Sequence, residues 1–156
     1  MEVFGSRWKN HWQRIAADWN SRVSDDDVVL IAGDTSWAMH LKEAQEDLDQ
    51  IRALPGKKII IRGNHDYWWE SAGKLNRMDA ENNMQYLYGS TAVLGDKDIA
   101  ICGTHGWVCP GDIHYQEDRD AKPYRRELLR VERTLKPRPC SASTPSSCST
   151  TRRSAI

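Results

Sequence analysis

Apolar residues recur every three or four positions in three stretches of the chain, which is the spacing of one face of an α-helix. The pattern predicts helices over 7–23, 41–54 and 118–136. A Pro-Gly pair closes the second helix, and Pro123 would lie in the first turns of the third. The apolar positions of the third helix are Leu128, Leu129, Val131 and Leu135.

Tryptophans dominate the apolar face of the first predicted helix. The members of this face are Trp8, Trp12, Ile15, Trp19 and Val23. We interpret the face as core-facing, because an apolar stripe of this kind normally packs against the interior of a domain. The alternative is a partly exposed wall above a ligand pocket.

Two continuous apolar runs, VVLIAG at 28–33 and KKIIIRG at 57–63, are typical of strands buried on both faces. With the second helix between them they form a strand–helix–strand unit, so we expect a right-handed crossover and parallel strands. The aspartates at 25–27 precede the first run and are interpreted as a solvated turn, not a metal site. Three shorter strands are predicted at 85–89, 91–95 and 98–103.

The composition narrows the classes of protein to consider. The chain has 156 residues, a length typical of one domain, and its 22 basic residues equal its 22 acidic ones. A net charge of zero argues against binding to nucleic acid or to an anionic membrane through bulk electrostatics. No apolar run approaches the ~20 residues that span a bilayer. The four cysteines have no zinc-type spacing and no signal peptide precedes them, so we expect a soluble, cytoplasmic protein with free thiols.

Metal-type ligands follow both apolar runs. Asp34 comes directly after one run and Asn64 after the other. Because the carboxyl ends of parallel strands meet at one crevice, with strands ~4.8 Å apart, these two side chains can share a metal ion or bind two neighbouring ions. Gly33 and Gly63 let the backbone turn tightly there.

Two further side chains complete this candidate site. His65 can donate a proton near neutral pH, and Asp66 could fix the tautomer of that imidazole as a partner behind it. The ligand set is rich in oxygen and lacks thiolate, which suits Mn, Mg, Fe or Zn better than copper.

The two motifs resemble those of a known family. Gly-Asp at 33–34 followed by Gly-Asn-His-Asp at 63–66 is similar to the second and third motifs of the calcineurin-like metallophosphoesterases. The segments VFGSRW, GDTSWAM, LPGKKIIIRGNHDYWW and ICGTHGW resemble a bacterial branch of that family. The resemblance extends from about Glu2 to Lys136 and implies an α/β fold, a four-layer α/β/β/α sandwich of two mixed sheets, incomplete in this chain.

The resemblance also implies a reaction. By matching positions, Asp34 would be the carboxylate that bridges two divalent ions (Mn, Fe, Zn or Mg), and Asn64 would bind the second ion. In this mechanism ions ~3.5–4 Å apart hold a hydroxide and clamp the attacking and leaving oxygens of the phosphoester. His65 would assist as the general acid, which contributes about 10²–10⁴-fold to the rate. The identity of the phosphoester is not readable from the sequence.

Other motifs of the family are absent from this sequence. No Asp-x-His, the motif of the family's first strand, occurs before Asp34, and a later histidine and a Gly-His-x-His are missing. We expect Met1 to be an internal methionine; a true loss of the first strand is the alternative. The other histidines (His11, His40, His105 and His114) are interpreted as ordinary loop or surface residues and not as metal ligands.

The last part of the chain differs in character from the rest. We assign residues 1–136 to a partial metallophosphoesterase domain and 137–156 to an irregular tail rich in Ser, Thr and Pro. We hypothesise that a frameshift near Lys136 produced the tail, because a Leu-His-Tyr-Pro-Pro coding segment read one base late can give the sequence Cys148–Arg153. A clean reading frame across codons 130–156, with no metal motif downstream, would refute this.

Two interpretations follow for the activity of the chain. One is a metal-dependent phosphoesterase, and the other is a non-catalytic remnant or binding module that keeps part of the fold. Because transition-metal sites normally need four to six ligands, Asp34 and Asn64 alone should bind metal weakly. We therefore predict that the chain as written holds little metal and has weak or no phosphatase activity.

Overall fold

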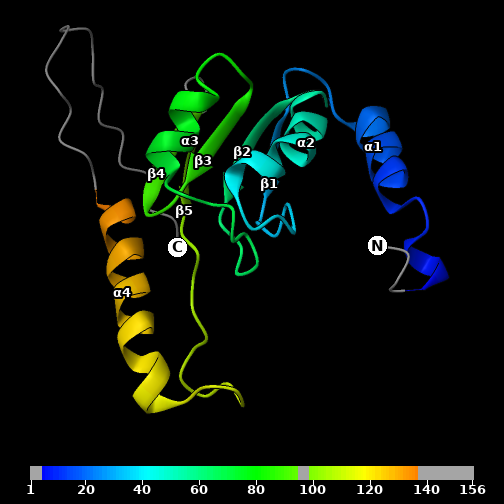
Figure 1. The fold of residues 1–156 in the computed structure, drawn as a ribbon. Coiled ribbons are helices and arrows are strands. Elements are labelled where there is room, and N and C mark those ends of the chain that lie inside the picture. Colours follow the sequence, from blue (N-terminus) through cyan, green and yellow to red (C-terminus); the bar gives the residue numbers. More distant parts are fainter. Residues whose placement is uncertain (1–4, 95–98, 137–156) are drawn as a thin grey trace, which may run out of the picture.

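The structure, a computed structural model, describes residues 5–94 and 99–136. In these ranges α-helices alternate with strands through the first half of the chain, and a strand pair and a long helix follow (Figure 1). The elements are a 3-10 helix (Ser6–Trp8), α1 (His11–Arg22), β1 (Val28–Ile31), α2 (Leu41–Arg52), β2 (Lys57–Ile61), α3 (Ala72–Met78), β3 (Met84–Leu87), β4 (Ser90–Leu94), β5 (Ile99–Gly103) and α4 (Glu117–Leu135).

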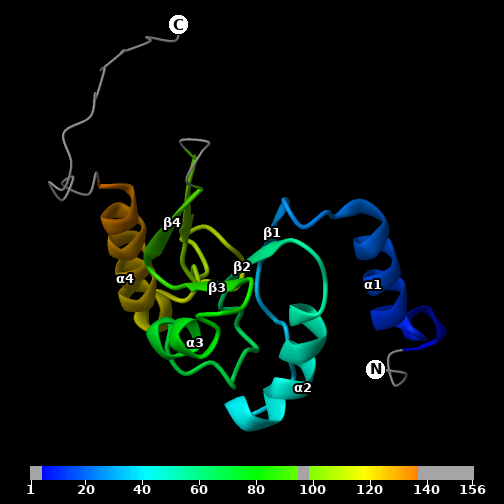
Figure 2. The ribbon, with the colours of Figure 1, turned by 90° about the horizontal axis from the view of Figure 1, so that it is seen from above.

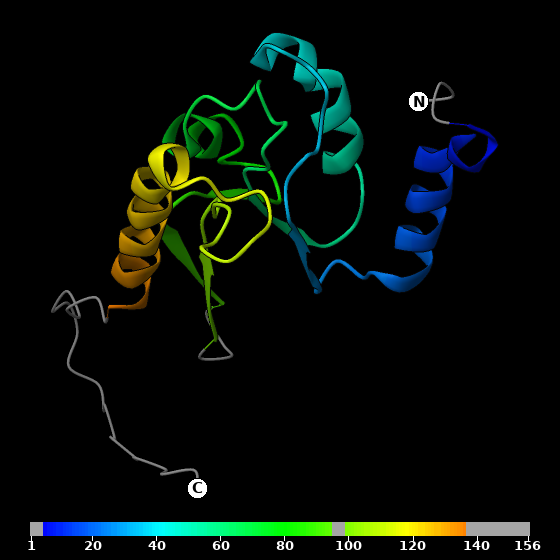
Figure 3. The ribbon, with the colours of Figure 1, turned by 90° about the horizontal axis from the view of Figure 1, so that it is seen from below.

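The strands form two sheets. The first has the order β1-β2-β3 and is parallel throughout, and the second pairs β4 with β5 in antiparallel fashion. Helices α2 and α3 lie on one side of the parallel sheet (Figure 2). The β4–β5 pair and α4 extend away from it in the view from below (Figure 3). The predicted α/β class and the parallel strand–helix–strand unit are confirmed, with parallel pairing in one sheet and antiparallel pairing in the other.

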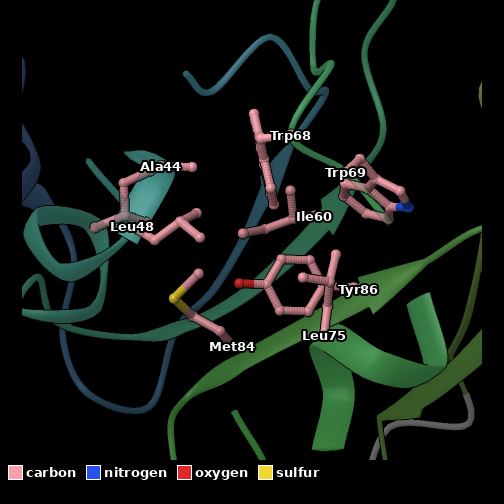
Figure 4. Close-up of a cluster of buried hydrophobic side chains, with 9 residues drawn as sticks. Ala44, Leu48, Ile60, Trp68, Trp69, Leu75, Met84 and Tyr86 are labelled. Carbon is pink, nitrogen blue, oxygen red and sulfur yellow. The ribbon is translucent and has the colours of Figure 1, made fainter. Parts of the chain in front are cut away.

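Strand β2 contributes to two separate clusters of apolar side chains, as a period of two along a strand requires. Ile60 packs on the helical side with residues of α2, α3 and β3 (Figure 4). Ile59 and Ile61 face the other way and pack with Leu87 and Ala92. The prediction of burial on both faces is therefore confirmed for β2. It is wrong for β1, where Leu30 is 61% exposed because β1 is the edge strand of the sheet. The second cluster joins the two sheets, since Ala92 belongs to β4.

Helix α1 differs from its prediction. The 3-10 helix is separated from it by Asn10, which has a left-handed backbone (φ 52°), and no residue of α1 is buried. Trp12 packs against the main core, but Trp8 is 46% exposed. The core-facing interpretation is therefore corrected. Helix α1 lies at the β1 edge of the parallel sheet (Figure 2), and a cavity of about 840 Å³ opens between the helix and Val29.

Helix α3 was not predicted, because seven residues are too few to show a helical period. Its sequence signal is the N-cap Ser71, whose Oγ accepts a hydrogen bond from the Lys74 N–H at 3.2 Å. The turn at 25–26 is exposed as predicted. Cys102 and Cys109 are free thiols, and the other two cysteines and the whole tail at 137–156 lie outside the described residues.

Helix α4 occupies nearly the predicted range, with Pro123 inside it. Its four predicted apolar residues are all at least 37% exposed, and its buried side chains are Asp120 and Glu127. The helix therefore contacts β4 and β5 through polar groups, for example through the Thr91 hydroxyl, which donates to the Thr134 carbonyl at 3.1 Å. In the described parts of the chain, none of the helices combines the length and apolarity needed to cross a membrane.

A buried polar network ties α2, α3 and β3 together. Asp79 is 1% exposed and accepts hydrogen bonds from Arg52 Nε (2.6 Å), the Tyr86 hydroxyl (2.7 Å) and Asn82 Nδ2 (2.7 Å). Burial opposes ionisation of Asp79, but these donors outweigh it and hold the pKa of the carboxyl below its ordinary value. Burial, together with the Asp79 carboxylate, raises the pKa of Tyr86.

Replacement of Asp79 by Asn should destabilise the fold, because it leaves Arg52 without its buried partner. We expect the free energy of unfolding in urea to fall by about 3 kcal/mol at pH 7. A carboxyl whose pKa is lowered by folding stabilises the protein above its unfolded pKa (about 3.9) and loses that contribution as the pH falls through the folded value. The difference from the wild type should therefore shrink at pH 3.

The matched control is Asp49→Asn, since Asp49 also bonds to Arg52 but its side chain is 68% exposed. That variant should lose less than about 1 kcal/mol. Equal losses from Asp79→Asn and Asp49→Asn would show that the buried network does not stabilise the fold.

Candidate metal and phosphoester site

The candidate site lies where β1 and β2 end. The two strands are parallel neighbours, with Ile31 opposite Ile60, so the loops that follow them leave the sheet on the same edge. These loops carry Asp34 and Asn64, and the structure brings them together as the sequence predicts. The convergence is a direct consequence of parallel pairing, because both strands point their carboxyl ends at one crevice.

Glycine is required on both loops because their backbones nearly touch. Gly33 has a left-handed backbone (φ 92°), and a Cβ there would overlap the backbone nitrogen of Gly63. A Cβ on Gly63 would overlap the carboxylate of Asp34. Asp34 itself has a left-handed backbone (φ 54°), which Asp tolerates better than most residues.

A single buried carboxylate joins the two loops. Asp66 is fully buried and accepts hydrogen bonds from the backbone N–H groups of Asp34 (2.8 Å), Thr35 (2.8 Å) and Gly63 (2.7 Å). The Thr35 hydroxyl (3.0 Å) and the indole N–H of Trp68 (2.9 Å) also donate to it. Five donors replace the water that an exposed carboxylate would bind, so the buried charge is satisfied.

This role of Asp66 differs from the expectation that it would fix the tautomer of His65. Its two oxygens are already occupied by the donors of the two loops and of Trp68. The imidazole instead has its Nδ1 3.4 Å from Oδ2 of Asp34. The sequence showed that Asp66 belongs to the site, but spacing alone could not show which groups it would bond.

Asp34 and His65 face each other at the opening of the site. Their side chains are 49% and 46% exposed. The backbone N–H of His65 donates to Oδ1 of Asp34 at 2.9 Å, and this bond is the main cause that holds the pKa of Asp34 below its ordinary value. The Asn64 amide nitrogen lies 3.0 Å from His65 Nδ1. Asp34 is consequently ionised over the whole neutral range, as a metal ligand must be.

Residues that the sequence analysis did not assign to the site form its other wall. A cavity of about 630 Å³ is lined by Asp34 and Asn64 on one side and by His105, Trp107 and Arg119 on the other. His105 is close enough to Asp34 to contribute to lowering the pKa of that carboxyl. No local motif marked His105, because Thr104 separates it from the last glycine of β5 and its approach to Asp34 depends on how the two sheets pack.

Arg62 lies beside the Asn64 loop and lines the same cavity. Its Nε atom is buried and has no hydrogen-bond partner among the described residues. The cavity therefore combines an acidic ligand, an amide and cationic groups, a set of side chains that suits a bound cation beside an anionic ester.

Comparison with protein families fits this geometry. The family model described as calcineurin-like phosphoesterase matches residues 6–141. The chain belongs to the calcineurin-like phosphoesterase family. The match spans all the helices and strands from the 3-10 helix to α4, so the resemblance carried by the Gly-Asp and Gly-Asn-His-Asp motifs is confirmed. Searches of curated proteins and of solved structures gave no match.

Calcineurin-like phosphoesterases bind divalent metals, and the side chains at this cavity can be compared with what such a site needs. Asp34 offers a half-exposed carboxylate and Asn64 an amide at the same cavity. Across 5–94 and 99–136, however, no three or more His, Cys, Asp or Glu side chains gather around one point. These residues fit one portion of a metal ligand shell and do not complete it.

The close approach of the two loops gives a direct test of the site geometry. Gly63→Ala should lower the free energy of unfolding by about 1–3 kcal/mol, because the added methyl group overlaps Asp34 and forces the loops apart. The matched control is Gly73→Ala in α3, where the nearest atom, Arg77 Nη1, is 3.6 Å from the new methyl group. That change should leave stability unaltered or raise it by up to about 1 kcal/mol. If both variants unfold at the same urea concentration, the loops are not held in contact.

Proposed function

We propose that Asp34, Asn64 and His65 form part of a two-metal phosphoester hydrolase site. The observation that carries this proposal is the half-exposed Asp34 carboxylate, which faces His65 and shares a cavity with Asn64. The general reaction, metal-dependent hydrolysis of phosphoesters, is that of the family to which the chain belongs.

The metal ligands in this proposal are oxygen atoms of Asp34 and Asn64. The Asp34 carboxylate stays ionised because the N–H of His65 bonds to it, so no proton competes with a cation there. Divalent ions held by these two residues would lower the pKa of a nearby water and neutralise charge on the phosphoryl oxygens. The glycines leave room for an anion to approach the backbone of both loops.

His65 acts as the proton donor to the leaving oxygen. Its Nδ1 lies 3.4 Å from Oδ2 of Asp34, and the Asn64 amide nitrogen lies 3.0 Å from Nδ1 and 3.3 Å from Nε2. In this proposal Nε2 is the ring nitrogen that exchanges a proton with the ester. Its ring also contacts two aromatic side chains, Trp37, stacked at 5.7 Å between centroids, and Tyr67, edge-on at 6.3 Å. These contacts restrict the orientation of the imidazole, and general acid catalysis requires a positioned proton donor.

A non-catalytic binding module is the second candidate, and one observation favours it. In the part of the chain that the structure describes, the ligand shell is incomplete. We infer that the chain by itself binds metal weakly and turns over slowly. We also propose that the protein is cytoplasmic and that it has no nucleic-acid or membrane partner. Its substrate in this proposal is a phosphoester of unknown identity.

Titration with Mn²⁺ tests the proposal, because a paramagnetic ion broadens nearby NMR signals even when it binds weakly. We expect the backbone signals of Asn64 and His65 to broaden in the wild type and to stay sharp in Asp34→Asn. Asp26→Asn, in the exposed turn before β1, is the matched control and should behave as the wild type. With millimolar Mn²⁺ the chain should hydrolyse p-nitrophenyl phosphate slowly, and Asp34→Asn should abolish that rate.

Equal broadening in Asp34→Asn and in the wild type would exclude Asp34 as a ligand and defeat the proposal. Robust turnover that is lost in Asp34→Asn would support the site but refute the prediction of weak activity.

A further inference from the structure

An aromatic wall of the cavity has no part in the proposed reaction. Trp107 lies in the connection between β5 and α4 and lines the cavity that also contains Asp34 and Asn64. The indole is 41% exposed, although tryptophan is normally among the most buried side chains on average. A large apolar ring kept partly open beside a charged site needs a physical reason.

The indole is held in place by a buried carboxylate. Its Nε1 donates to Oδ1 of Asp120 at 3.1 Å, and Asp120 is only 1% exposed. Asp120 also accepts from the backbone N–H of Gln116 (2.8 Å) and from Arg119 Nε (2.9 Å) and Nη2 (2.8 Å). The Arg119 guanidinium holds the pKa of Asp120 well below its ordinary value, so the acceptor of the indole is ionised at neutral pH.

His105 extends the aromatic wall toward Asp34. The rings of His105 and Trp107 have centroids 6.0 Å apart and planes tilted by 32°. His105 is itself oriented, with its Nδ1 2.8 Å from the Gly106 carbonyl oxygen. Because the indole N–H is already bonded to Asp120, the surface that Trp107 offers to a ligand is its carbon ring. Such a surface prefers the flat face of another ring to an aliphatic group.

We propose that Trp107 is a stacking platform for a planar aromatic ring in the alcohol portion of the phosphoester, with the phosphoryl group directed at Asp34 and Asn64. This inference rests on the proposed function of the same cavity. Its volume of about 630 Å³ is within the range of small-molecule sites. The ring can come from an aryl alcohol or from a nucleoside, since both present the same planar face.

Paired ligands of matched charge test the platform. Phenyl phosphate and cyclohexyl phosphate differ in the planarity of the ring, and adenosine 5′-monophosphate and ribose 5-phosphate differ in the presence of the base. With Mg²⁺ present, each ester is titrated into the full chain and followed by the backbone N–H signals of Asn64 and His65, which every variant retains, and in the wild type also by the indole N–H signal of Trp107. The Trp107 signal is identified by its absence in Trp107→Phe.

We expect the aromatic member of at least one pair to bind about fivefold to a hundredfold more tightly than its partner, the range typical of stacking on one aromatic side chain. Preference within the phenyl pair indicates an aryl alcohol, and preference within the nucleotide pair alone indicates a nucleoside. Trp107→Leu should abolish the preference, and Trp107→Phe, which keeps a ring, should retain most of it. Trp8→Leu removes another half-exposed indole (46% exposed), one that lies outside this cavity, and should leave the preference intact.

Equal affinities within both pairs in the wild type would overturn the platform and leave phosphoester binding intact. A preference that survives in Trp107→Leu would also overturn it, because the ring would then be recognised elsewhere. If none of the four esters binds, both the stacking platform and the proposed function are refuted.

Discussion

The buried carboxylate of Asp66 is the interaction on which the rest of the site depends. It binds backbone N–H groups from the loops after β1 and after β2, which are some thirty residues apart in the sequence. A hydrogen bond to a charged group contributes about 1.5–3 kcal/mol, whereas removing a carboxylate from water costs several kcal/mol. Only a set of donors as complete as the one around Asp66 can offset that cost. The carboxylate therefore requires both loops to be in place.

A buried carboxylate that accepts an indole N–H occurs at two places in the described residues. Asp66 accepts the indole N–H of Trp68, and Asp120 accepts that of Trp107. Each carboxylate also accepts backbone N–H groups of a loop that lines the site. The first fixes the wall that carries the metal-type ligands, and the second fixes the wall opposite. The packing of β4 and β5 on the parallel sheet then brings the walls together; Gly103 lies so close to Ile61 that a Cβ there would have little room.

Local sequence patterns predict the half of the site that parallel pairing assembles. Strands β1 and β2 have distinct apolar runs, and Asp34, Asn64 and His65 come straight after them, so adjacency follows from topology alone. The opposite wall depends on contacts between sheets, which no local spacing encodes, and so His105 was taken for an ordinary loop residue. The exposed face of α1 escaped prediction for a similar reason, because periodicity identifies an apolar stripe but not its partner.

Native-state hydrogen exchange of the N–H groups that bond to Asp66 tests whether this carboxylate holds the two loops together. The amides of Asp34, Thr35 and Gly63 should exchange slowly and with similar protection in the wild type. In Asp66→Asn all three should exchange at least about tenfold faster, because each loses a bond to a charged acceptor. If the three amides exchange in the wild type as fast as those of an open loop, or if Asp66→Asn leaves them protected, the carboxylate does not hold the two loops together.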